Sequence, residues 1–102
     1  MSSREYEALR NYREVARKVK EIVIEEDPRA EVYVFGSVVR GTYTAASDID
    51  LLVVTTNINK KHEIMVKVYK TIDAPIELHI ITPELYEKWY KRFISSNELV
   101  KV

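Results

Sequence analysis

An unbroken apolar run from Leu51 to Val54 constrains the fold of this chain more than any other sequence feature. Neighbouring side chains of a strand point to opposite faces, so a run without alternation indicates a strand that is buried on both sides. The run therefore predicts a strand over 48–55 in the middle of a sheet. Segments 31–35 and 76–81 are short and rich in β-branched residues, and we interpret them as two further strands.

Amphipathic helices are predicted between and around these strands. Apolar residues recur at steps of three and four from Tyr6 to Val23, and again from Ile64 to Ile72, which is the spacing of a helical stripe. Asp27-Pro28 is predicted to end the first helix, and Thr82-Pro83 to begin a third one. Alternating helices and strands imply an α/β fold, with helices packed on a small sheet of at least three strands.

The composition limits the classes of function. A chain of 102 residues is sufficient for a single domain, which we place over 1–102. Sixteen Lys and Arg residues balance sixteen Asp and Glu residues, which argues against nucleic-acid binding through bulk charge. The absence of cysteine excludes disulfides, thiolate zinc sites and cysteine nucleophiles. The sequence also has no membrane-length apolar run and a charged start, so we expect a cytoplasmic protein.

Two carboxylates, Asp48 and Asp50, stand at the start of the predicted central strand. At this spacing both side chains project from one face, where buried negative charges repel each other unless a cation lies between them. Oxygen ligands favour Mg²⁺ or Mn²⁺ over zinc, and Mg²⁺ commonly completes its shell with water and substrate phosphates. We therefore expect a substrate that contains phosphate. The alternative is a pair of solvated acids at the end of a strand.

A phosphate-binding turn is predicted upstream of the carboxylates. Gly36-Ser37 ends one strand and begins a helical turn, which brings backbone N–H groups and a hydroxyl to one point. Arg40 follows one turn later and could contact the same anion with its fork of donors. Taken alone, Gly36-Ser37 also fits an ordinary turn, and Arg40 also fits a surface ion pair. Together with the carboxylates they indicate phosphoryl or nucleotidyl transfer.

The spacing of these motifs carries a family resemblance. Gly36-Ser37, ten further residues and then Asp48-x-Asp50 resembles the minimal nucleotidyltransferase (MNT) family of the DNA polymerase β-like superfamily. Val39 departs from the family pattern, which usually has a small residue before the arginine. The resemblance implies an α/β (α+β) fold with a small mixed sheet, similar to the palm of polymerase β. It also implies a third carboxylate at Glu77, where many relatives carry aspartate.

The resemblance also implies an activity and a cofactor. Asp48, Asp50 and Glu77 would hold a pair of Mg²⁺ ions, while Gly36, Ser37 and Arg40 would bind phosphates of the nucleotide. The implied reaction transfers AMP from ATP to a hydroxyl and releases pyrophosphate. Small members of the family are similar to the antitoxins of MNT–HEPN toxin–antitoxin pairs, in which the acceptor is a tyrosine of a helical HEPN ribonuclease. Such a partner is implied here, although relatives that modify small molecules share the same motif.

A second hypothesis belongs to another class. The chain could be a weakly active or inactive nucleotide-binding module that neutralises a partner protein by binding it, and Glu77 in place of aspartate keeps this hypothesis open.

Two features outside the motif each have two interpretations. His79 shares a predicted face with Glu77 because side chains alternate along 76–81, so it either contacts the site or packs at the strand end. The last predicted helix carries an aromatic stripe, which is either core or a partner interface. The stripe consists of Tyr86, Trp89, Tyr90 and Phe93.

Overall fold

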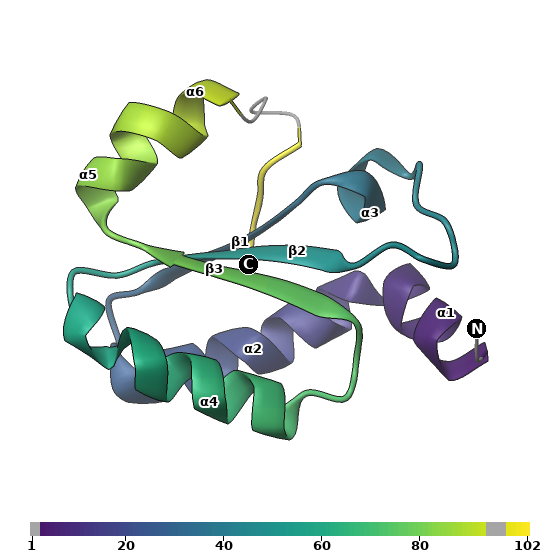
Figure 1. Ribbon diagram of the computed structural model, residues 1–102, viewed down its shortest axis with the longest axis horizontal. Helices are drawn as coiled ribbons and strands as arrows, with labels where there is room; N and C mark the ends of the chain where they lie inside the picture. Colours follow the sequence, from purple (N-terminus) through teal and green to yellow (C-terminus); the bar gives the residue numbers. More distant parts are fainter. Residues whose placement is uncertain (1–2, 94–97) are drawn as a thin grey trace.

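A four-stranded mixed sheet separates two layers of helices (Figure 1). The computed structural model describes residues 3–93 and 98–102. The strand order is β3-β2-β1-β4, with β1 antiparallel to both β2 and β4, and with β2 parallel to β3. The strands are β1 (Glu31–Phe35), β2 (Ile49–Val54), β3 (Ile76–Ile81) and β4 (Val100–Lys101). The predicted α+β fold is confirmed, and the apolar run lies in a central strand.

The helices follow the predicted order, with one interruption. The stripe that begins at Tyr6 is divided at Asn11, because asparagine has a weak helix propensity and here leaves the helical conformation. The second of the two resulting helices ends directly before Asp27, as predicted. The helical elements are α1 (Ser3–Arg10), α2 (Tyr12–Glu26), α3 (Ser37–Arg40), η1 (Ile58–Lys60), α4 (Lys61–Thr71), α5 (Pro83–Leu85), η2 (Tyr86–Tyr90) and α6 (Lys91–Phe93).

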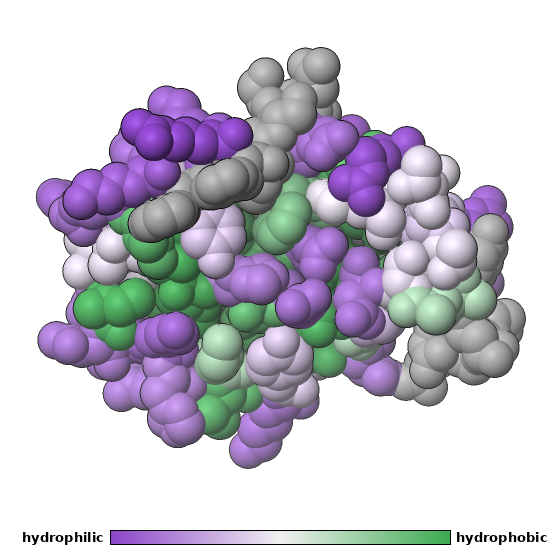
Figure 2. Space-filling model, turned by 45° about the horizontal axis from the view of Figure 1, so that its top comes forward, coloured by the Kyte–Doolittle hydropathy of each residue, from purple (hydrophilic) through white to green (hydrophobic). Residues whose placement is uncertain are grey.

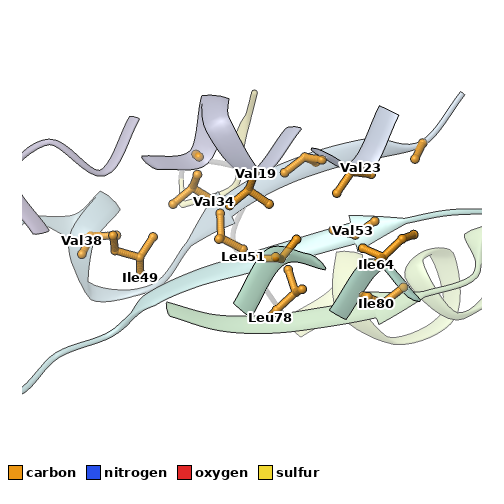
Figure 3. Close-up of a cluster of buried hydrophobic side chains, with 14 of the residues drawn as sticks. Val19, Val23, Val34, Val38, Ile49, Leu51, Val53, Ile64, Leu78 and Ile80 are labelled. Atoms are coloured by element: carbon orange, nitrogen blue, oxygen red, sulfur yellow. The ribbon is translucent and has the colours of Figure 1, made fainter. Parts of the chain in front are cut away.

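Helices α2 and α4 cover one face of the sheet and form the main hydrophobic core with it (Figures 1 and 3). Along β1 every second residue is buried, as expected for a strand that turns one side to this layer. Tyr69 of α4 adds a polar contact, because its hydroxyl accepts the Leu78 N–H at 3.0 Å. The core includes Val19, Val23, Val34, Leu51, Val53, Ile64, Leu78 and Ile80.

The segment from α5 to α6 lies over the opposite face, which it shares with α3 (Figure 1). Thr82 caps α5 by accepting the Leu85 N–H at 3.3 Å, and proline occupies the first turn, as predicted. Tyr86 and Tyr90 pack against a second, smaller cluster on this face, so this part of the aromatic stripe is core. The side chains of Trp89 and Phe93 lie outside the described part of the structure. None of the described helices has the length and apolar character that crossing a membrane would require.

Candidate active site

The register between β2 and β3 places two acidic residues next to each other. Asp50 is paired with Glu77 across these parallel strands, and with Phe35 of β1 on its other side. The Ile49 N–H donates to the Pro75 carbonyl at 2.8 Å and holds the two strands together where they begin. The side chains of Asp50 and Glu77 point away from α2 and α4. They lie on the face where Figure 2 shows hydrophilic residues gathered near the middle.

His79 joins this pair from the same face of β3. Its Nε2 atom lies 3.7 Å from Oε1 of Glu77. One ligand atom from each of Asp50, Glu77 and His79 lies within 4.8 Å of the other two. Alternation along 76–81 predicted that His79 shares a face with Glu77. Its approach to Asp50 depends on the register of two strands, which a single sequence does not reveal.

The pKa of Asp50 shows that burial and the neighbouring acidic groups disfavour its charged form. Burial is the main cause that raises the pKa of Asp50 to about 6, and hydrogen bonding with Glu77 and the negative charge of Glu77 add to it. The charge of Asp48 acts in the same direction, whereas His79 acts in the opposite one. A divalent cation between the carboxylates would remove this repulsion, so the donor set fits the ion that the sequence predicts.

Gly36 forms the wall of the site beside Asp50. Its φ angle of +85° is one that residues with a side chain rarely adopt. A Cβ atom at this position would lie only 2.2 Å from Oδ2 of Asp50, so the close contact requires glycine. The predicted phosphate-binding turn, Gly36-Ser37, is therefore directly adjacent to the carboxylate.

Ser37 begins α3 at this wall. The carbonyl of Gly36 accepts the N–H groups of Val39 and Arg40, both at 3.1 Å. The N–H groups of the first residues of any helix have no acceptor within that helix. The Ser37 N–H and hydroxyl thus belong to a turn that can offer donors to an anion beside Asp50.

Asp48 and Arg40 lie at the margin of the site. Asp48 is exposed and directly precedes β2, and among the described residues it is not part of the group within 4.8 Å. Arg40 Nη1 lies 3.5 Å from Oε2 of Glu98, which is the ion-pair alternative that the sequence left open. Glu98 was missed by sequence reasoning, because no local pattern connects it to α3.

Comparison with known proteins decides the family. A sequence model of the nucleotidyltransferase domain matches residues 16–102. The chain belongs to this family. The chain is also similar to the crystal structure of a candidate nucleotidyltransferase, with 35% identity, a TM-score of 0.67, and coverage of 84% of this chain and 95% of that chain. A comparison with curated proteins found no match.

A second structural relative of this nucleotidyltransferase domain supports the fold. It is a candidate nucleotidyltransferase from Sulfolobus solfataricus, with a TM-score of 0.64 and 24% identity. The match covers 99% of this chain and 87% of that chain. Nucleotidyltransferase domains typically use divalent metals, and the cluster of Asp50, Glu77 and His79 is where this one could hold such an ion.

Proposed function

We propose that this domain transfers a nucleoside monophosphate, AMP from ATP, to a hydroxyl group in a reaction that depends on Mg²⁺. The observation that carries the proposal is the position of Asp50, which is paired with Glu77 on one side and touches the Gly36 backbone on the other. A site for a cation and a turn for phosphates therefore share one carboxylate. Membership of the nucleotidyltransferase family supports the reaction class.

The acidic residues have two tasks in this proposal. Asp50 and Glu77, together with Asp48, would hold Mg²⁺, which neutralises phosphate charge and makes an attacking hydroxyl more acidic. The acceptor oxygen attacks the α-phosphorus, and the bond from this phosphorus to the bridging oxygen of the β-phosphate breaks. Pyrophosphate leaves with that oxygen, and Glu77 accepts the proton of the acceptor hydroxyl.

The turn and the arginine position the nucleotide. Gly36 lets the phosphates approach the backbone closely, because it has no side chain. Ser37 donates its hydroxyl and N–H to phosphate oxygens. Arg40 reaches the same phosphates by exchanging its contact with Glu98 for them, since an exposed ion pair at 3.5 Å is weak.

We propose that the acceptor is a tyrosine of a small helical partner of the HEPN type, so that this chain acts as the antitoxin of a pair. The support is the likeness of short members of the family to such antitoxins. The second candidate function is a weakly active or inactive binding module that neutralises the partner without modifying it. Two observations favour this candidate: Asp48 is exposed and, among the described residues, outside the cluster, and Arg40 is engaged by Glu98.

The test follows the α-phosphate. The protein, purified with any associated partner, is incubated with Mg²⁺ and ATP labelled in either the α- or the γ-phosphate. We expect only the α-label to appear on a partner protein, and the Asp48→Asn/Asp50→Asn variant to lose this signal. Glu63→Gln is the matched control, because it removes an exposed carboxylate from α4 on the other side of the sheet.

The other outcomes separate the two candidates. ATP binding without label transfer, and without pyrophosphate release on candidate small acceptors, would support the binding module. Neutralisation of the partner by the double variant would support it as well, because a binder does not need the carboxylates. Transfer of the γ-label would contradict both candidates.

A further inference from the structure

His79 is better placed than Asp48 to complete a cation site with Asp50 and Glu77. Its ligand atom lies with theirs inside a group that spans at most 4.8 Å, whereas Asp48 is exposed and, among the described residues, outside this group. With bonds of about 2.1 Å, two ligand atoms of one ion are roughly 3.0 Å apart when adjacent and roughly 4.2 Å apart when opposite. The three ligand atoms therefore need to approach one another by less than about 2 Å to bind one ion.

The imidazole of His79 is held by two aromatic rings. Its centroid lies 5.8 Å from that of Phe35 and 6.3 Å from that of Tyr90, and 32% of the side chain is exposed. Phe35 is also the β1 partner of Asp50, so one residue contacts both the histidine and the strand position of the carboxylate. A ligand restrained in this way loses little conformational entropy when it binds an ion.

The Nε2 atom of His79 is directed towards the carboxylates, since it lies 3.7 Å from Oε1 of Glu77. Mg²⁺ prefers oxygen ligands, whereas imidazole nitrogen suits transition metals, and Mn²⁺ accepts both carboxylate and imidazole. We propose that His79 is a nitrogen ligand in this site, and that the cluster consequently binds Mn²⁺ more tightly than Mg²⁺. This inference rests on the proposed function, because it names the ion that the same site takes.

A purely structural role for His79 is the competing explanation. A histidine packed against two aromatic rings can stabilise this face of the sheet without binding an ion. The two roles differ in one direct observable, because only a ligand places its nitrogen in the coordination sphere of the metal.

The experiment measures Mn²⁺ alone, without nucleotide, by electron spin-echo envelope modulation. The chain has only two histidines, and His62 is exposed on α4 on the other side of the sheet, so it provides a matched control. We expect imidazole nitrogen modulation in the wild type and in His62→Gln, and its loss in His79→Gln. Thermal unfolding without metal checks that His79→Gln is folded. If it is not, nitrogen modulation that persists in His62→Gln still assigns the ligand to His79, because the chain has only these two histidines.

Calorimetric titration gives a second measure. We expect His79→Gln to weaken Mn²⁺ binding by about tenfold or more and to leave Mg²⁺ binding nearly unchanged. Equal losses for both ions, or Mn²⁺ binding that requires Asp50 but shows no nitrogen modulation, would overturn the assignment of His79 while the proposed function stands. Metal binding that is unaffected by Asp50→Asn would overturn both.

Discussion

The two faces of the sheet differ in what they bury, although they are built from the same strands. On the face covered by α2 and α4, Leu51 and Val53 are fully buried among aliphatic side chains. On the other face, Asp50 is only half-buried, and Glu77 leaves 57% of its side chain exposed. Alternation along β2 thus turns Leu51 and Val53 to the main core and Asp50 to the other face, where only a smaller cluster around Leu52 and Val54 is buried. Substitutions at neighbouring positions should therefore have opposite consequences.

Asp50→Asn should have the largest effect on the polar face. Loss of its charge should reduce label transfer from ATP by about a thousandfold. The raised pKa of Asp50 shows that its charged form is disfavoured in the fold, so the variant should melt at the same temperature as the wild type or higher without metal. Transfer assays and thermal unfolding at about pH 7.5 measure both. A variant that loses activity and stability together would break the comparison between the faces.

Leu51→Ala, at the next position, should have the reverse effect. It removes a fully buried side chain from the main core and should reduce the free energy of unfolding by about 2–5 kcal/mol. Urea denaturation measures this loss. Leu85→Ala is the control, because 39% of Leu85 is exposed and its truncation should change stability by only about 0.5 kcal/mol. Similar losses in the two variants would contradict the assignment of the core to this face.

Gly36→Ala should affect both properties. The new Cβ would meet Oδ2 of Asp50 at 2.2 Å in a conformation that favours glycine, so we expect a loss of about 2 kcal/mol and displacement of the carboxylate. Gly41→Ala is a matched control, with a φ angle of +76° but, apart from its chain neighbours, no atom of the described residues within 4 Å of an added Cβ. Denaturation and transfer assays on both should show a much larger loss of activity for Gly36→Ala. Equal losses would mean that the Asp50 contact is unimportant.

The smallest expected effect is a pH dependence from Asp50. Its pKa is raised to about 6 in the fold, so the folded state binds this proton more tightly than the unfolded state. The stability that the protonated group contributes is present below its unfolded value of about 4 and is lost as the pH rises through about 6. As the pH rises through about 6, the urea midpoint of the metal-free wild type should therefore decrease more than that of Asp50→Asn. Parallel pH profiles would contradict the raised pKa.

Most of the sheet could be predicted from the sequence because its strands carry strong local signals. Segments 31–35 and 76–81 coincide with β1 and β3, and the apolar run lies within β2. The strand β4 (Val100–Lys101) was missed, because two residues have no detectable periodicity and form a strand only by pairing with β1.

The proximity of some motif residues could be predicted from the sequence, whereas their roles stay predictions. Gly36 and Asp50 proved to be in contact, and Glu77 lies beside Asp50. The approach of His79 and the ion pair of Arg40 depend on strand register and on a distant segment of the chain. Neither leaves a trace in local spacing, so tertiary structure was needed to find them.

The parallel pairing of Asp50 with Glu77 also has a consequence for folding kinetics. Parallel strands need a crossover connection, and the connection between β2 and β3 contains α4. Glu77 therefore reaches Asp50 only when β3 has paired with β2, and such non-local pairing is slow. An intermediate that contains only β1 and β2 therefore lacks the complete site. A ligand that contacts both carboxylates binds the finished sheet and not its precursors. Such a ligand should stabilise the native state by lowering its rate of unfolding, and it should change the rate of folding little.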